Sequence, residues 1–260
     1  MRLLAAVLMF LPACLLAKEV DVELFLAVDV SRSMSPAELE IQRRGYAEAI
    51  TSTQVIEAIQ SGMLGRIAVT YVEWAGSGSQ RVVVPWTEVA SAEDAAIVAR
   101  GITNRFETGM RRTSISSALS YATAAFDDNG FTGLRRVIDV SGDGPNNQGG
   151  GVIAARDAAL ARGIIINGLP LMTQDALSEM WGIPDLDAYY RHCVIGGPGA
   201  FVIPVLEWSQ FADAVKRKLV LEIAQAAPTP QLVQYAPPAA YDCLVGEKMW
   251  DRNRTYFDIP

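Results

Sequence analysis

Two short segments of the sequence carry hard oxygen ligands at the point where an apolar run ends. The segment DVSRSMS follows the run LFLAV and places Asp29, Ser31 and Ser33 at alternate positions. The segment VSGDG places Asp143 directly after a second apolar run. Carboxylate and hydroxyl oxygens are the ligands of hard divalent cations such as Mg²⁺. Each segment alone is also typical of an ordinary strand-to-helix turn, so a metal site requires the fold to bring them together.

The apolar runs before these segments are expected to be strands. Four runs show little alternation of apolar and polar residues, which is typical of parallel strands covered on both faces. They are LFLAVD (24–29), RIAVTYVEW (66–74), RRVIDVSGD (135–143) and GIIINGLPL (163–171). A fifth run, QRVVVPW (80–86), follows the second after a Gly/Ser turn, and its Pro85 suits a sheet edge. We predict that this run is an antiparallel edge strand.

Segments with helical patterns separate the predicted strands. In the first of these segments, Ser35 is the predicted N-cap, a proline follows at the first helical position, and Glu38 completes a capping box. Ser91 and Asp94 form a second predicted capping box. The predicted helices are 35–59, 91–102, 114–126, 151–163 and 207–225. This alternation predicts an α/β fold with a doubly wound, mostly parallel sheet, one antiparallel edge strand, and helices on both faces.

Such a fold would place both oxygen-rich segments where ligands bind. In doubly wound sheets, ligands bind at the carboxyl ends of the strands. Asp29 ends the first predicted strand, and Asp143 ends the predicted strand that begins at Arg135. We therefore expect a site at this edge of the sheet.

The composition excludes several classes of function. The 260 residues include 22 Lys and Arg against 29 Asp and Glu, which gives a net charge of −7 without a basic cluster and argues against nucleic-acid binding. The chain has one histidine, His192. Zinc sites usually need several His or Cys ligands, and Ser-His-Asp catalysis would depend on this single imidazole.

Residues 1–17, MRLLAAVLMFLPACLLA, have the features of an export signal. The basic Arg2 precedes an apolar run, and small residues precede the charged KEV, so we predict cleavage after Ala17. The run is too short for a transmembrane span. Lipidation at Cys14 is the alternative, because LPAC resembles the bacterial lipobox, and an uncleaved anchor is a third interpretation. The protein is expected to be exported, either periplasmic or secreted.

Removal of the signal leaves two cysteines, Cys193 and Cys243. In an oxidising compartment an even pair suggests a disulfide, and two buried free thiols are the alternative. A bridge closing a loop of about 50 residues would contribute at most ~4 kcal/mol in the chain-entropy model. It would tie an irregular, Pro/Ala-rich tail (226–260) back to a domain at 18–225.

A further segment, which lies between DVSRSMS and VSGDG in the chain, completes a known pattern. In chain order, DVSRSMS is the first segment, MRRTSISSAL is the second, and VSGDG with the PNN that follows it is the third. MRRTSISSAL presents Thr113 just before a predicted helix. Together the three segments make the sequence resemble the von Willebrand factor A-type domain over roughly residues 22–225. The resemblance assigns the ligands of that family's metal-ion-dependent adhesion site to Asp29, Ser31, Ser33, Thr113 and Asp143.

The resemblance implies binding, and no catalytic residue. Three hydroxyls and two carboxylates, several acting through water, suit Mg²⁺ or a similar divalent cation such as Mn²⁺. In the family, an acidic side chain of a partner protein fills the open position on the cation. A metal-assisted hydrolase is the competing interpretation, although His192 lies far along the chain and no other base is evident. A structural domain with a vestigial metal site is the third interpretation.

Several residues depart from the pattern of the family. Arg111 and Arg112 stand where glycines usually precede the threonine; they would repel a cation or, if they point outward, hold an anionic partner. Gly142 changes the usual TDG to GDG. Asp139 lies inside a predicted buried strand, where we expect a paired core acid; support of the metal ligands is the alternative.

Three remaining segments bring no further chemistry. YYRHCVIGGPGAFVIPV (189–205) predicts a tight glycine loop before an apolar strand, and it resembles a bacterial, exported branch of this family with no established role. Within it His192 and Cys193 are adjacent, an arrangement in which side chains seldom aim at each other. GDGPNN is a near-miss of a dinucleotide motif, with Asn147 in place of the third glycine. DDNGFTG (127–133) is expected to be a helix-to-strand turn and not a calcium loop.

Overall fold

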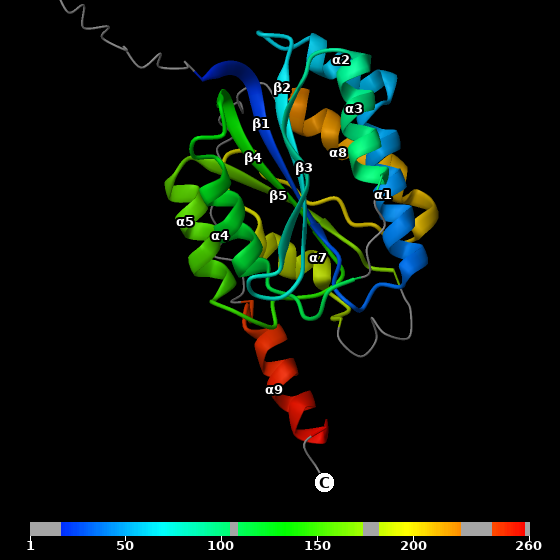
Figure 1. Ribbon diagram of the computed structural model, residues 1–260. Coiled ribbons are helices and arrows are strands. Elements are labelled where there is room, and N and C mark those ends of the chain that lie inside the picture. Colours follow the sequence, from blue (N-terminus) through cyan, green and yellow to red (C-terminus); the bar gives the residue numbers. More distant parts are fainter. Residues whose placement is uncertain (1–16, 105–108, 174–181, 225–240, 258–260) are drawn as a thin grey trace, which may run out of the picture.

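The protein folds around one five-stranded sheet with helices on both faces, as a computed structural model shows (Figure 1). The structure describes residues 17–104, 109–173, 182–224 and 241–257. The strands are β1 (Lys18–Asp29), β2 (Ile67–Trp74), β3 (Gln80–Val89), β4 (Phe131–Gly142) and β5 (Ile164–Pro170). Their order in the sheet is β3-β2-β1-β4-β5.

The strand pairing confirms the predicted sheet. β2 and β3 are antiparallel, with β3 at the edge, and the other neighbouring pairs are parallel. In the register of β1 and β4, Val28 pairs with Ser141. Because the two strands run in the same direction, Asp29 and Asp143 emerge at the same edge of the sheet.

The helices form one layer on each face of the sheet (Figure 1). One layer consists of α1 (Pro36–Ile50), α2 (Thr53–Gln60), α3 (Ala92–Thr103) and α8 (Phe211–Ala224). The other consists of α4 (Ile115–Ala125), α5 (Val152–Ala161), α7 (Leu186–Tyr189) and the π-helical turn Tyr190–Val194. Each layer buries its own apolar cluster against the sheet, so the strands are apolar on both faces. This explains the missing alternation in their sequences.

Both predicted capping boxes are present, at Ser35 with Glu38 and at Ser91 with Asp94. The prediction of one helix over 35–59 is wrong, because the chain breaks between α1 and α2. There the Ser52 hydroxyl donates to Ala49 O (2.7 Å) and accepts the N–H of Val55 (3.4 Å). A serine side chain that satisfies the end of one helix and the start of the next competes with the continuous helix.

The apolar strand predicted after the glycine loop is also wrong. Val202 and Val205 form isolated parallel bridges to Gly168 and Leu171, and no regular strand forms there. Pro204 lies between them, and a proline has no N–H to donate to a ladder. The turn predicted at 127–133 is confirmed, since α4 ends before it and β4 starts within it.

The prediction of an irregular tail is wrong for its last part, which forms α9 (Val245–Phe257). Residues 225–240 lie outside the described residues. The proline-rich composition that suggested an irregular tail ends at Pro238, and the residues that follow can form a helix. Figure 1 shows α9 leaving the molecule at the edge where β1 ends.

A disulfide between Cys193 and Cys243 holds the start of α9, as predicted, with the two Cα atoms 5.6 Å apart. It joins the residues before α9 to the π-helical turn on the α4–α5 face of the sheet. The pairing removes the thiol of Cys193 from any part in nucleophilic chemistry.

The described residues contain no helix that is long and apolar enough to cross a bilayer. The export signal and the lipidation candidate Cys14 fall outside them, so both stay predictions.

Asp139 is a paired core acid, as predicted. Its carboxylate lies 2.7 Å from the Lys218 ammonium of α8, which also contacts Glu222. Asn167 of β5 donates to Glu222 Oε1 (3.0 Å), and all four side chains are fully buried. Burial raises the pKa of Glu222 to about 7 and the pKa of Asp139 above its usual value, while Lys218 opposes both shifts.

Lys218→Met is expected to lower the free energy of unfolding by about 3–5 kcal/mol, because it leaves two carboxyl groups buried without a cation. Without Lys218 the carboxyl pKa values rise further. The folded variant then binds protons more tightly than its unfolded chain, so its loss of stability should shrink as the pH falls. Urea unfolding at several pH values measures this. The control is Lys216→Met, because Lys216 is only partly buried and pairs with the exposed Asp213. A loss of stability in Lys218→Met that is equal at every pH would contradict the assignment of Lys218 as the partner of the two buried acids.

Candidate metal site

The structure brings the first and third oxygen-rich segments into direct contact. Asp29 is the last residue of β1, and Asp143 follows the last residue of β4. Ser31 joins them, because its hydroxyl donates to Asp143 Oδ1 (3.3 Å) and lies 2.9 Å from the hydroxyl of Ser33. Four of the five predicted ligands therefore lie in one cluster at the carboxyl edge of the sheet.

The fifth predicted ligand, Thr113, is held next to the third segment by its backbone. Its N–H donates to Asn147 Oδ1 (3.0 Å), and its carbonyl accepts the N–H of Asn147 (2.9 Å). Thr113 is buried, and α4 begins two residues later, with Ser114 as its N-cap.

The second segment also lies against the first. The N–H of Met110 donates to Val30 O (2.8 Å), and Met110 forms a parallel bridge with Ser31. A Cβ atom on Gly109 would lie 2.9 Å from Val30 O, so only glycine allows this approach. The three segments thus form one surface, although residues 105–108 lie outside the described part of the chain.

The Asp29 carboxylate is buried and only partly satisfied. Its Oδ1 accepts the N–H of Ser31 (2.7 Å), whereas its Oδ2 has no hydrogen-bond partner among the described residues. Burial, and then the neighbouring Asp143, raise the pKa of Asp29 well above its usual range. Burial next to a second carboxylate is unfavourable for an ionised acid unless a cation compensates it.

The residues present fit a hard divalent cation. The cluster offers two carboxylates and two hydroxyls, with the Thr113 segment beside it, and these are all oxygen donors of the kind that Mg²⁺ and Mn²⁺ accept. No group of three or more His, Cys, Asp or Glu side chains that could hold a metal occurs among the described residues. A cation held by only two carboxylates would keep net positive charge, so the site could attract an anionic group.

The replacement of the family's usual residue by Gly142 has a steric reason. A Cβ atom on Gly142 would lie 2.9 Å from Asp29 Oδ2 and 2.9 Å from the hydroxyl oxygen of Tyr190. The Tyr190 side chain therefore occupies the space that a larger residue at 142 would need.

Sequence reasoning missed the residues that fasten these segments together. Asn146 accepts the N–H of Ser116 at the start of α4 (3.0 Å) and donates to Gly150 O (3.1 Å). Gln42 of α1 donates to the Asp29 carbonyl (2.8 Å). Asn146 and Asn147 lie in GDGPNN, shortly after the predicted ligand Asp143. Their amide side chains were the available signal, since Asn side chains often bridge backbone groups in loops.

Two of the arginines in the metal segments are exposed and free of carboxylates. Arg32 and Arg111 have no ion pair within the described parts of the chain. Arg112, with a left-handed φ of 71°, places its guanidinium 4.1 Å from the ring centre of Trp250 on α9. Arg111 and Arg112 are therefore both exposed at the surface, and Arg112 packs on Trp250 of α9.

His192 is no evident base for the hydrolase alternative. Its ring stacks on Tyr241 with the ring centres 5.4 Å apart, and its neighbour Cys193 is in the disulfide.

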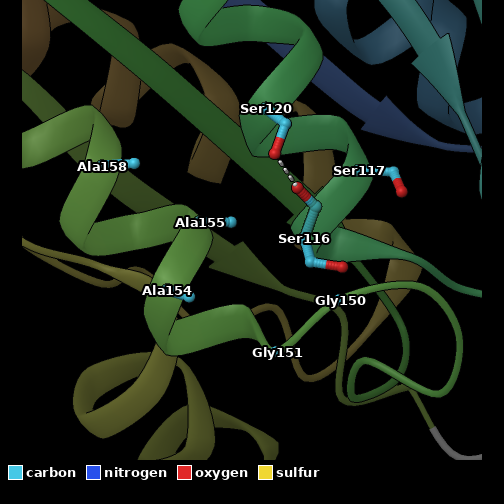
Figure 2. Close-up of a pocket in the computed structure, with 8 residues that line it drawn as sticks. All are labelled: Ser116, Ser117, Ser120, Gly150, Gly151, Ala154, Ala155 and Ala158. Carbon is cyan, nitrogen blue, oxygen red and sulfur yellow. Dashed lines mark hydrogen bonds between the residues drawn. The ribbon is translucent and has the colours of Figure 1, made fainter.

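A groove of about 420 Å³ lies beside the third segment, between α4 and α5 (Figure 2). Its lining consists of small residues, namely Ser116, Ser117, Ser120, Gly150, Gly151, Ala154, Ala155 and Ala158. None of these residues is titratable, so the groove adds no acid or base to the site.

Three solved structures share the fold. Proximal thread matrix protein 1 from the mussel byssus matches with a TM-score of 0.58 and 15% identity over 80% of this chain and 49% of that chain. The pilus adhesin SpaC from Lactobacillus rhamnosus GG matches with a TM-score of 0.54 and 15% identity over 80% of this chain and 31% of that chain. A von Willebrand factor type A structure from Catenulispora acidiphila matches with a TM-score of 0.51 and 13% identity over 79% of this chain and 43% of that chain. This chain spans about half or less of each matched chain.

Gly142→Ala is expected to lower the free energy of unfolding by about 1–3 kcal/mol without any cation, because the added methyl group overpacks the space between Asp29 and Tyr190. Urea unfolding measures the loss. Gly150→Ala is the matched control, since a Cβ there meets nothing within 4 Å. Equal stability of the two variants would contradict the close approach.

No curated protein sequence matches the chain. A family model described as a protein of unknown function, DUF1194, matches residues 19–227, which is most of the chain. With the structural matches, this confirms the expected resemblance to a bacterial branch of A-type domains without an established role. The chain therefore belongs to the DUF1194 family, on a von Willebrand factor A-type fold.

Proposed function

We propose that this protein is an exported binding protein that uses a divalent cation to hold an acidic group of a partner protein. Asp29, Ser31, Ser33, Thr113 and Asp143 would hold the cation, either Mg²⁺ or Mn²⁺. The observation that carries the proposal is the buried Asp29 carboxylate, which faces Asp143 and has an Oδ2 atom without a partner among the described residues. A cation would compensate both charges.

The structural neighbours support this proposal without extending it to a partner. One structure of the mussel matrix protein has a zinc-occupied metal-ion-dependent adhesion site, and another neighbour is a pilus adhesin. Both names concern those proteins. The predicted signal at residues 1–17 and the disulfide support export, since disulfides persist in oxidising compartments.

The charge around the site favours an acidic partner. Arg32 and Arg111 are exposed and lie within the metal segments, although the whole chain carries a net charge of −7. A positive rim around a cation attracts carboxylates and speeds their association. We expect the partner segment to contain more than one acidic residue, with one on the cation and others on the rim.

Asp29→Asn and Asp143→Asn are each expected to abolish saturable binding of Mg²⁺ and Mn²⁺, because each removes a charged oxygen ligand. Calorimetric titration of residues 18–260 measures the binding. Asp157→Asn on α5 is the control, since Asp157 is exposed and pairs with the adjacent Arg156. Absence of cation binding in the wild type would favour a structural domain with a vestigial site.

An array of Asp- and Glu-rich peptides, beside matched peptides with Asn and Gln, tests the recognition of acidic groups. Acidic peptides should bind in the presence of Mg²⁺, and this binding should be lost when EDTA removes the cation. Arg32→Gln and Arg111→Gln should each weaken this binding about 2- to 5-fold and reduce its salt dependence. Arg44→Gln, an exposed position on α1, should leave it unchanged. Equal binding of the amide peptides would refute the proposed partner chemistry.

A further inference from the structure

The end of α7 and the π-helical turn that follows it carry two buried tyrosines toward the candidate metal site. Tyr189 and Tyr190 are both fully buried. The Tyr190 hydroxyl has no hydrogen-bond partner among the described residues. A tyrosine hydroxyl carries its proton at neutral pH, so Tyr190 can donate a hydrogen bond.

Two glycines let the Tyr190 side chain cross the sheet surface. A Cβ atom on Gly168 of β5 would lie 2.6 Å from Cδ1 of the ring, and a Cβ atom on Gly142 of β4 would lie 2.9 Å from the hydroxyl oxygen. The same point on Gly142 would lie 2.9 Å from Asp29 Oδ2. The Tyr190 hydroxyl and the unpartnered Asp29 oxygen therefore face the same small space.

Tyr189, the last residue of α7, contacts the third metal segment. Its hydroxyl oxygen accepts the N–H of Asn146 (3.1 Å). The Asn146 side chain in turn donates to Glu247 Oε1 of α9 (2.7 Å). A Cβ atom on Gly246 would lie 2.1 Å from Asn146 O, so α9 also packs on the backbone of this segment.

The disulfide fixes the position of the turn. Cys193 lies in the turn, and Cys243 lies two residues before the first residue of α9. Tyr241 stacks on His192 and has its ring centre 6.2 Å from that of Tyr189. The turn is thus clamped between the sheet and the start of α9.

We infer that Tyr190 is a positioning residue of the metal site: with the cation bound, its hydroxyl donates to Asp29 Oδ2 and, together with the N–H of Ser31 on Oδ1, holds the carboxylate in one orientation. The disulfide-anchored turn sets the place of the hydroxyl. The inference rests on the proposed function, because it requires a cation at Asp29. Hydrogen bonds that orient a ligand typically change metal affinity by 10–100-fold.

Tyr190→Phe tests the inference, with Tyr121→Phe as the matched control. Tyr121 lies on α4 and is 38% exposed, so the control loses a hydroxyl away from the turn. Calorimetric titration with Mn²⁺ should give about 10-fold weaker binding, or more, for Tyr190→Phe and unchanged binding for Tyr121→Phe. The melting temperature of the cation-free Tyr190→Phe variant should not fall, because the lost hydroxyl has no partner there.

An ultraviolet difference spectrum separates positioning from general support of the fold. Addition of Mg²⁺ should perturb tyrosine absorption in the wild type and in Tyr121→Phe, and the tyrosine signal should be lost in Tyr190→Phe. If Tyr190→Phe does not fold, mild reduction of the wild-type disulfide is the second arm. It leaves Tyr190 in place, frees the turn, and should weaken Mn²⁺ binding until the protein is reoxidised.

The outcomes distinguish this inference from the proposed function. Wild-type affinity and an unchanged tyrosine signal in Tyr190→Phe would overturn the inference alone, and so would Mn²⁺ affinity that is insensitive to reduction. Failure of the wild type to bind either cation would overturn the proposed function and the inference with it.

Discussion

The site depends on two carboxylates that the sheet forces together. Asp29 and Asp143 follow adjacent parallel strands, β1 and β4, and therefore emerge at one edge close to each other. Asp29 is buried there, with one oxygen that no described residue satisfies. Burial of a carboxylate beside another is costly, and the hard cation that we propose at this site would relieve that cost.

A second buried acid shows how the same problem is solved inside the core. Asp139 lies on β4 as well, but on the opposite face of the sheet, where Lys218 of α8 compensates its charge at 2.7 Å. The protein thus supplies a cation to the acid inside the core. No described residue supplies one to Asp29 at the edge of the sheet, and under the proposed function a bound divalent cation would take that role.

The groups around the site act mainly on the backbone of the loops. Asn146 and Asn147 tie the third segment to the start of α4 and to Thr113, and Gln42 holds the backbone of Asp29. Gly109 and Gly142 allow approaches that any Cβ atom would block. The disulfide and α9 hold this assembly from the side of the π-helical turn. Hydroxyl oxygens bind a cation weakly on their own, so a site that relies on them would need its loops held in place by such contacts.

The sequence alone determined the strands of the sheet, the caps of α1 and α3 and the disulfide pair. It also determined the segments that carry Asp29, Thr113 and Asp143. Apolar periodicity, cap chemistry and ligand type are properties of short stretches, so they can be recognised without the fold. The predictions from the sequence were wrong about the break at Ser52, about a strand after the glycine loop and about the last part of the tail, which forms α9. Only the tertiary structure decided that Lys218 pairs with Asp139 and that Tyr190 reaches past Gly168 and Gly142 to Asp29. These contacts join residues far apart in the chain, and nothing in either local sequence specifies the partner.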